Sequence, residues 1–236
     1  MKIENLKFEG VSFTHEGQEP IVQNVEFDFP MNEILWVKAE EGAGKSSLLQ
    51  ILAGLQIPQS GKYLINGENV VDMSFEEFLP YRLKIGYSFD YGGLINNRTL
   101  YDNLMLPLLY HKVLTPEESK ARVDEMIREF GIEKFAQERP AHVPGRIRKL
   151  TCLMRAVVMR PEVLLLDDPS VGLGQDSVYV FADHVHRLRK EGVLKHVFIS
   201  SYDEKFMNLF NYQIIHLDEG QLYFQAVDPE KRVVHL

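Results

Sequence analysis

The amino-acid sequence predicts an α/β fold with a mostly parallel core sheet, an antiparallel side sheet and a helical subdomain. Residues 34–37 and 163–166 form two continuous apolar runs, which are typical of strands buried on both faces of a parallel sheet. Shorter alternating runs near the start of the chain indicate antiparallel strands. We expect one domain over residues 1–236, with a core formed by 1–90 and 161–236 and a helical subdomain at 91–160.

The side sheet is predicted from short runs of strand-forming residues separated by turn residues. Gly10, Gly17 and Pro20 mark turns between the first runs. Asn66-Gly67 is a dipeptide typical of β-hairpins, so the antiparallel region resumes there. The predicted strands of this sheet cover residues 6–8, 11–13, 25–29 and 62–65.

Helices are predicted where a capping residue precedes a pattern of helical period. Ser74 and Thr115 each have a glutamate three residues later and so begin capping boxes, and Thr99 caps a third helix. Gly131 is a suitable stop for the helix that begins after Thr115. The later helices are predicted at 146–160 and 175–190, and the remaining strands at 84–89, 163–166, 196–200, 214–217 and 222–224.

A glycine-rich segment with the sequence AEEGAGKSS, residues 39–47, follows the strand at 34–37 and leads into a helix at 46–55. Glycines let backbone N–H groups curl around a phosphate, and the helix points its positive dipole end at the same phosphate. Lys45 would reach the β- and γ-phosphate oxygens, and the Ser46 hydroxyl would hold Mg²⁺. The predicted nucleotide site comprises Glu41, Gly42, Ala43, Gly44, Lys45, Ser46 and Ser47.

This segment, which we call the phosphate loop, departs from the G-x-x-x-x-G-K-[ST] pattern at its first glycine, which is Ala39. Glu40 and Glu41 also place negative charge beside the phosphate site. The alternative is a chance Gly-Lys-Ser in a turn, but the flanking strand and helix favour the nucleotide loop. One face of that helix carries the apolar residues Leu48, Ile51, Leu52 and Leu55.

Composition and charge exclude several classes of protein. The 236 residues are 45% hydrophobic, which is enough for a sizeable core. A net charge of −8 argues against a nucleic-acid partner, and the single Cys152 excludes an internal disulfide and any Cys-based zinc site. No apolar run approaches the roughly 18 residues of a membrane span, and the N-terminus lacks an apolar signal core. We expect a soluble cytoplasmic protein that reaches a membrane through a partner.

A second candidate residue, Asp167, ends the apolar run at 163–166. A carboxylate at the carboxyl end of a central parallel strand lies beside the phosphate loop, where it can hold the Mg²⁺ shell as a Walker B aspartate does. An aspartate after an apolar run can also be an ordinary loop or cap residue. Its pairing with the phosphate loop favours the metal role.

The order of these elements resembles an ATP-binding-cassette (ABC) ATPase, a P-loop NTPase, over essentially the whole chain. The segments KSSLLQILAGLQIPQSGKYLINGENV and MRPEVLLLDDPS are similar to that family. The segment GGLINNRTLYDNLMLPLLYH most resembles the ATPases of Mce- and Mla-type bacterial lipid transporters. Lys45, Ser46 and Asp167 match the family's Walker residues plainly.

The resemblance also places functional positions of the family on residues of other types. The adenine-stacking aromatic falls on His15, which as a lone loop histidine can also be merely solvated, and the Q-loop glutamine falls on Asp90. The catalytic glutamate falls on Asp168 and the switch histidine on Tyr202. The LSGGQ signature falls on residues 143–147 and the D-loop aspartate on Gly174.

These replacements carry a physical cost. The Asp168 carboxylate stops roughly 1.5 Å short of a glutamate's, and a misplacement of about 1 Å can lower a rate about 100-fold. Tyr202 donates one hydrogen bond but cannot become an imidazolium. Pro144 lacks the hydroxyl and the N–H of the signature serine, and Arg146 is bulky where a glycine allows close approach. Two further cations, Arg148 and Lys149, either meet phosphate or lie on a solvated basic helix face.

The resemblance implies the nucleotide-binding subunit of an ABC transporter, which binds Mg-ATP and hydrolyses it slowly or not at all. It implies a membrane permease as partner, a homo- or heterodimer of ABC domains, and a peripheral place on the inner face of the membrane. One alternative is a pseudo-ATPase with a structural or regulatory role, and another is a soluble ABC protein outside any transporter. The apolar stretch at 104–110 either receives the permease or packs internally, and Trp36 and Cys152 are expected in the core.

Overall fold

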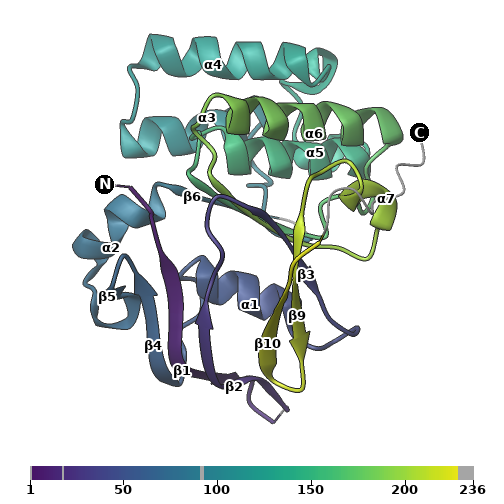
Figure 1. Ribbon diagram of the computed structural model, residues 1–236. Helices are drawn as coiled ribbons and strands as arrows, with labels where there is room; N and C mark the ends of the chain where they lie inside the picture. Colours follow the sequence, from purple (N-terminus) through teal and green to yellow (C-terminus); the bar gives the residue numbers. More distant parts are fainter. Residues whose placement is uncertain (1, 18, 91–92, 228–236) are drawn as a thin grey trace.

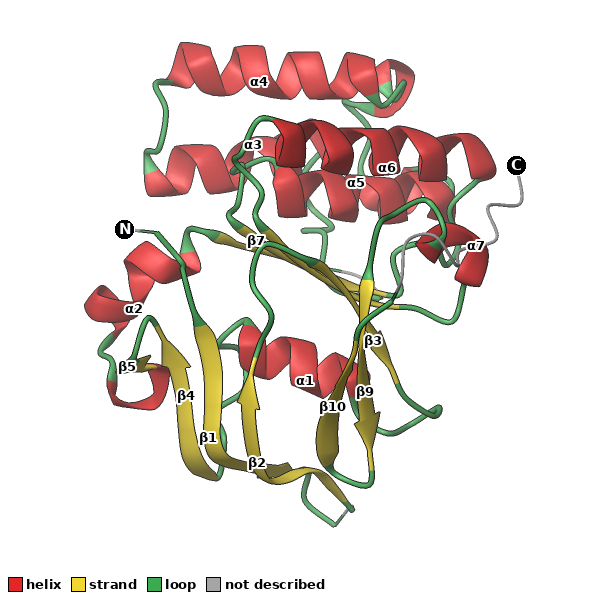
Figure 2. Ribbon diagram, viewed as in Figure 1, coloured by secondary structure: helices red, strands yellow, loops and turns green. Residues whose placement is uncertain are grey.

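Two β-sheets and a layer of helices make up the protein, which is described here by a computed structural model covering residues 2–17, 19–90 and 93–227 (Figure 1). A six-stranded sheet crosses the middle of the molecule, with a group of long helices on one face (Figure 2). A single helix and a four-stranded sheet cover the other face. The predicted α/β fold is confirmed.

The central sheet is mostly parallel, as the apolar runs predict. Its strands are β3 (Ile34–Lys38), β6 (Ile85–Ser88), β7 (Val163–Asp167), β8 (His196–Ser200), β9 (Gln213–Asp218) and β10 (Gln221–Gln225), in the order β10-β9-β3-β8-β7-β6. Only β10 among them runs antiparallel to its neighbour, β9. Every residue of β7 is buried. Parallel strands end at a common edge, and the ends of β3, β7 and β8 therefore carry the candidate site.

The side sheet contains β1 (Leu6–Thr14), β2 (Pro20–Asp28), β4 (Ser60–Ile65) and β5 (Glu68–Asn69), paired antiparallel. The prediction of a turn at Gly10 is wrong, because β1 runs through that residue as one strand. Gly10 has φ 61°, and the pairing register shifts between Phe8 and Val11, so the glycine forms a bulge instead. Asn66-Gly67 makes the predicted hairpin between β4 and β5.

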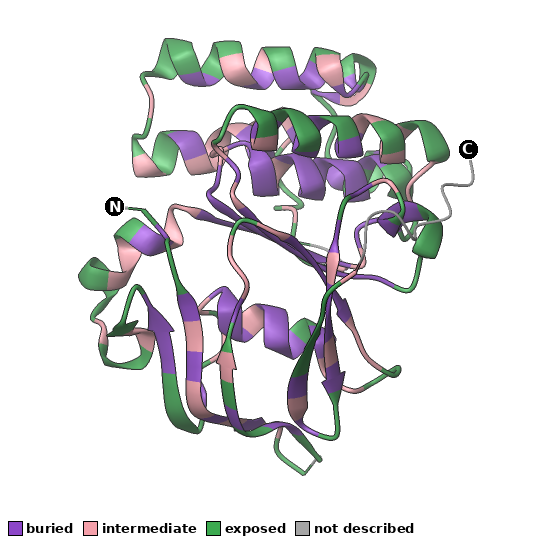
Figure 3. Cartoon of the chain, in the orientation of Figure 1, coloured by how far each residue is buried: buried purple, intermediate pink, exposed green. Residues whose placement is uncertain are grey.

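Helix α1 (Lys45–Leu52) lies between the two sheets (Figure 3). Its residues Leu48, Ile51 and Leu52 are buried against the side sheet and the lower face of the core sheet. The prediction that Leu55 continues this face is wrong, because the helix ends before Gly54, which has φ 66°. Leu55 lies beyond the end of the helix and is exposed.

The helical layer comprises α3 (Leu100–His111), α4 (Pro116–Glu129), α5 (Gly145–Val157) and α6 (Gln175–Lys190). Thr99 and Thr115 form the predicted caps, each bonded to the third residue of its helix. These helices share one apolar core with the upper face of the sheet, and Trp36 belongs to it. Two shorter helices, α2 (Phe75–Arg82), with its predicted Ser74 cap, and α7 (Glu204–Met207), lie outside this layer (Figure 1). Short 3₁₀ turns occur at Val70–Asp72, Glu133–Phe135 and Pro140–His142.

Within the described ranges, none of the helices combines the length and the apolar character that a membrane crossing requires.

Candidate functional site

The phosphate loop connects β3 to α1, as predicted. Gly42 and Gly44 have φ values of 80° and 97°, which place both in the left-handed region. A Cβ on Gly44 would lie 2.5 Å from Cγ2 of Ile21, so β2 presses against the loop at this point. No side chain caps the first turn of α1, whose backbone N–H groups therefore remain directed at the loop. The arrangement suits an anion.

Lys45 lies at the first position of α1 and is only 7% exposed. Its Nζ donates to the carbonyls of Ala39 (3.4 Å) and Glu40 (3.5 Å), both of them long hydrogen bonds. The same ammonium contacts the Tyr202 hydroxyl and lies 3.8 Å from the centre of that ring. The sequence-predicted lysine and switch-position tyrosine are thus in direct contact, and Tyr202 covers the cation that would meet phosphate.

Two serines follow Lys45 and have different surroundings. Ser46 is exposed at the start of α1, where its hydroxyl is open to a metal. Ser47 is buried, and its Oγ lies 2.9 Å from Nε2 of His15. The His15 ring also packs edge-on against Phe13 of β1. The structure therefore brings His15 to the phosphate loop and does not leave it merely solvated.

Asp167 ends β7 and is 3% exposed. Its Oδ1 accepts a hydrogen bond from Oγ of Ser200 at 2.6 Å, and the two residues are register partners in the parallel pair β7–β8. Ser200 was missed by the sequence analysis, although a polar residue that ends an apolar strand was a usable signal. Its hydroxyl holds the Asp167 carboxylate in place at the end of β7.

Asp168 adopts a left-handed backbone conformation, with φ 41°. Its N–H donates to the Ser200 carbonyl at 3.0 Å, which fixes this conformation. Its Oδ1 is buried and has no hydrogen-bond partner among the described residues. Burial, together with the charges of Asp167 and Asp90, raises the pKa of the Asp168 carboxyl. A carboxylate with a raised pKa is the stronger base, which suits a water-activating role.

Asp90 follows β6 and faces helix α5. Its Oδ1 lies 3.5 Å from Nζ of Lys149, and its carbonyl accepts from the same ammonium at 2.8 Å. Lys149 is 8% exposed, so of the two alternatives given for it, the solvated basic face does not apply. Arg148 donates to the carbonyls of Pro140 (3.4 Å) and Val143 (3.0 Å) and thus links α5 to the segment that precedes it.

The segment at 143–147 begins α5. Val143 is buried, and Pro144 occupies the N-cap position without any side-chain cap bond. Arg146 is exposed on the first turn. Gly174, at the D-loop position, caps α6. Of these groups, only the Arg146 side chain is free to extend toward another molecule.

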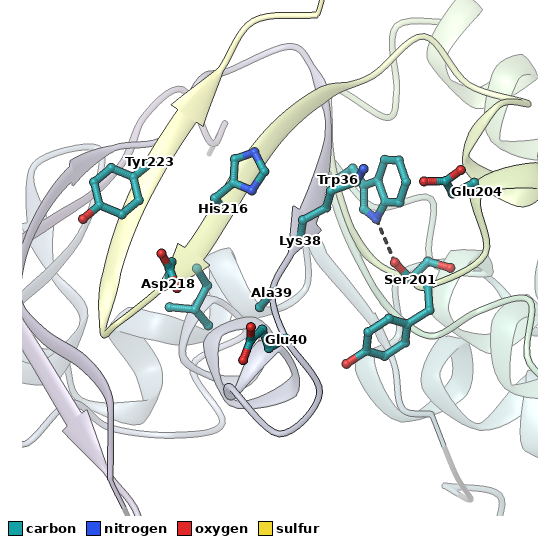
Figure 4. Close-up of a pocket in the computed structure, with 11 residues that line it drawn as sticks. Trp36, Lys38, Ala39, Glu40, Ser201, Glu204, His216, Asp218 and Tyr223 are labelled. Carbon is teal, nitrogen blue, oxygen red and sulfur yellow. Dashed lines mark hydrogen bonds between the residues drawn. The ribbon is translucent and has the colours of Figure 1, made fainter. Parts of the chain in front are cut away.

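A cavity of about 560 Å³ borders the phosphate loop on the side of Tyr202 (Figure 4). Its wall includes Trp36, whose Nε1 donates to the Ser201 carbonyl at 2.8 Å. Lys38 lies over the Trp36 ring at 3.7 Å. Ala39 and Glu40 of the loop also line the cavity, whereas the predicted adenine-stacking residue His15 does not.

Comparison with known proteins decides the family. The family model described as "ABC transporter" matches residues 22–171, which is more than half of the chain. The chain belongs to the ABC transporter family. At this level its function also follows: it is the nucleotide-binding subunit of an ABC transporter.

Individual relatives agree with this assignment. The chain is 28% identical to YtrE of Bacillus subtilis (strain 168), an ABC transporter ATP-binding protein, with 80% of this chain and 82% of YtrE covered. It is also 28% identical to the cell division ATP-binding protein FtsE of Escherichia coli (strain K12), with 92% and 97% covered. The dimeric structure of MJ0796, a bacterial ABC transporter cassette, has a TM-score of 0.83 at 24% identity and covers 94% of this chain and 98% of its own. That structural likeness shows that the two share the ABC fold.

ABC proteins bind ATP with Mg²⁺, and the donor atoms of this chain fit both. Phosphate would meet Lys45 and the start of α1, and Mg²⁺ would meet the oxygens of Ser46 and Asp167, a donor set that this hard cation prefers. The bound metal would neutralise phosphate charge. Among the described residues, no group of three or more His, Cys, Asp or Glu side chains forms a separate metal site. The buried, unpartnered Oδ1 of Asp168 is consistent with a polar ligand or water beside Asp167.

Proposed function

We propose that the chain binds Mg-ATP at the phosphate loop and hydrolyses it slowly or not at all. The observation that carries this proposal is the contrast between Lys45 and Asp168. Lys45, Ser46 and Asp167 keep the residue types that bind phosphate and metal. Asp168 has a shorter side chain than glutamate, and its carboxylate oxygen makes no hydrogen bond within the described residues. Phosphoryl transfer depends on positioning, so binding is retained while water placement is poor.

A pseudo-ATPase is the alternative, and the contact between Tyr202 and Lys45 favours it. The tyrosine hydroxyl and ring hold the ammonium that would stabilise the γ-phosphate. If this contact persists in the nucleotide complex, the protein binds ATP without turning it over. Its role would then be structural or regulatory.

Docking on a membrane permease is supported by an apolar cavity of about 730 Å³ between α2, β6, α3 and α5. Phe75 of α2 and Tyr110 of α3 line this cavity and are 71% and 73% exposed. Large exposed aromatic side chains beside an apolar hollow are typical of an interaction site. Leu104 and Leu108, in the stretch at 104–110, pack internally, whereas Leu109 and Tyr110 remain exposed to the partner. This arrangement supports a peripheral place on the inner face of the membrane.

Pairing of two ABC domains is supported by the dimeric structures of MJ0796, one of which is described as a post-hydrolysis state bound to ADP and phosphate. In a dimer, the segment at 143–147 of one copy would close the phosphate loop of the other. This segment differs from the LSGGQ signature, so in a homodimer it would weaken the closing of both nucleotide sites. In a heterodimer it would weaken the partner's site. A lipid cargo stays a prediction from the sequence resemblance.

Titration with fluorescent ATP tests the nucleotide site. We expect Lys45→Ala to weaken binding clearly, and Lys62→Ala, which removes an exposed lysine of β4, to bind like the wild type. Equal binding by Lys45→Ala and the wild type would refute the assignment.

Docking on the permease is tested by co-purification. Tyr110→Asp should abolish co-purification with an integral membrane subunit, whereas Phe224→Asp, an equally drastic change on exposed β10, should not. Recovery of the wild type only as a soluble monomer would favour a soluble ABC protein.

A further inference from the structure

Lys149 is an unusual lysine because its ammonium group lies inside the protein. Lysine is rarely buried unless it is paired, since burial removes the charge from water. Burial accordingly lowers the pKa of Lys149, although Asp90 and Asp167 oppose this effect. The side chain comes from the second turn of α5, directly after the segment at 143–147. Something in the structure must therefore compensate an interior charge next to the nucleotide site.

The compensation comes from two segments that are far from Lys149 in the sequence. Its Nζ donates to the carbonyls of Asp90 (2.8 Å), Phe89 (3.4 Å) and Asp167 (3.4 Å). It also forms an ion pair with Oδ1 of Asp90 at 3.5 Å. One ammonium group thus joins helix α5 to the segment after β6 and to the end of β7.

The charges of this edge of the site depend on the same lysine. The Asp168 carboxyl is within electrostatic reach of the carboxylates of Asp90 and Asp167 and of the ammonium groups of Lys45 and Lys149. Oδ1 of Asp90 has no hydrogen-bond partner among the described residues, so the ammonium of Lys149 is its counter-charge. Without Lys149, the half-buried Asp90 side chain would keep its buried Oδ1 beside the phosphates with no counter-charge, which is unfavourable.

We propose that Lys149 is a positioning residue of the nucleotide site, which works with Asp90 as a charge pair and ties the helical layer to the phosphate edge. The inference rests on the proposed binding of Mg-ATP at the phosphate loop. The pair takes the place that a neutral Q-loop residue would fill. Because both members are charged, replacing either one alone by a neutral residue changes the field at the phosphates.

Three variants separate this role from simple packing. Lys149→Met keeps an unbranched apolar stem and removes the charge, so the affinity for a fluorescent ATP analogue should fall about tenfold. Asp90→Asn removes the carboxylate and leaves the ammonium unopposed beside the phosphates, so affinity should rise about threefold. The double variant restores the original charge balance, and its affinity should return to within about threefold of the wild type. Lys120→Met, on the exposed face of α4, makes the same charge change as a control.

Each outcome decides the proposal. Rescue of Lys149→Met by Asp90→Asn supports a charge pair, since a purely structural lysine would not be rescued at a carboxylate. If the double variant binds no better than Lys149→Met, the proposal is overturned. If Lys149→Met does not fold, Asp90→Asn alone still tests it, because weaker binding by that variant would contradict the proposal. The midpoint temperature of thermal unfolding, measured without nucleotide, gives an independent test. Lys149→Met should lower this temperature, and adding Asp90→Asn in the double variant should restore part of the decrease. Failure of the wild type to bind ATP would instead refute the proposed function, and this midpoint comparison would still test the pair.

Discussion

The phosphate loop and the catalytic edge, by which we mean the proposed site residues Asp90, Asp168 and Tyr202, are built in different ways. The loop is made of main chain, held by positive φ values at Gly42 and Gly44 and by the start of α1. The catalytic edge is made of side chains from three separate segments, each placed by contacts with distant residues. A main-chain site keeps its shape when side chains change, whereas a side-chain site changes with every substitution. This difference would let one half of the site keep the residue types of the family pattern while those of the other half change.

The largest effect is expected where main-chain geometry is disturbed. Gly44→Ala adds a Cβ that would lie 2.5 Å from Ile21 at a φ of 97°, so both sterics and backbone oppose it. We expect a loss of about 2–4 kcal/mol in the free energy of unfolding and of nucleotide binding. Urea unfolding and fluorescent-ATP titration measure the two effects.

Gly42→Ala is the matched control for this change. Its φ is 80°, but a Cβ there would meet nothing within 4 Å. Only the backbone penalty of about 1 kcal/mol is expected. Equal losses at Gly42 and Gly44 would show that contact with Ile21 does not shape the loop.

Sequence patterns predicted the phosphate loop better than the catalytic edge for the same reason. A strand, a glycine loop and a helix follow one another within residues 34–52, so local signals suffice. The roles of Lys149 and Ser200 depend on contacts with residues 59 and 33 positions away, which local periodicity does not report. Leu55 was misplaced because Gly54 ends the helix. The turn predicted at Gly10 proved to be a bulge, since pairing with β2 and β4 overrides the local signal.

The support of Asp167 should produce the next largest effect. Ser200→Ala removes the 2.6 Å hydrogen bond to a buried carboxylate. We expect a loss of about 1–3 kcal/mol in the free energy of unfolding, and a higher Mg²⁺ concentration for half-maximal ATP binding. Ser88→Ala, which removes a buried hydroxyl with only a 3.5 Å contact to Phe89, should cost less. An unchanged Mg²⁺ requirement in Ser200→Ala would contradict the metal role of Asp167.

Tyr202→Phe should have a smaller effect of opposite sign. The hydroxyl that holds Lys45 is lost while the ring is kept, so the ammonium becomes available to phosphate. Affinity for ATP should rise about two- to tenfold, as expected for release of one hydrogen bond. Titration at fixed Mg²⁺ measures this change, and lower affinity would show that the tyrosine contributes to nucleotide binding.

The smallest expected effect concerns His196, which lies away from the nucleotide site. It tests whether the stability of the core depends on pH independently of that site. The buried His196 accepts from the Asn32 N–H (2.8 Å) at Nδ1 and contacts the Ile3 carbonyl (3.1 Å) through Nε2, so the neutral ring fits. Burial lowers the pKa of His196, and the unfolded chain therefore binds the proton first as the pH falls. The free energy of unfolding should decrease below about pH 6.5, by at most about 1.4 kcal/mol per pH unit for this proton.

His196→Asn should flatten this pH dependence, and the exposed His142→Asn should not. Urea unfolding at several pH values compares the slopes. Equal slopes in His196→Asn and the wild type would assign the pH response to other groups.

The rate of ATP hydrolysis tests most directly the claim that binding is intact and water placement is not. Turnover of saturating Mg-ATP should be measured for the wild type, Asp168→Glu, Tyr202→His and the double variant. Glutamate restores the reach of the carboxylate, and histidine restores a switch that can contact the γ-phosphate. We predict slow turnover by the wild type and a rate for the double variant more than about tenfold above either single variant, because residues that act as a unit are non-additive. Background turnover in the double variant would assign the defect to residues 143–147 and favour the pseudo-ATPase. A wild-type rate of about 1 per second or faster, typical of an enzyme, would contradict the account of Asp168.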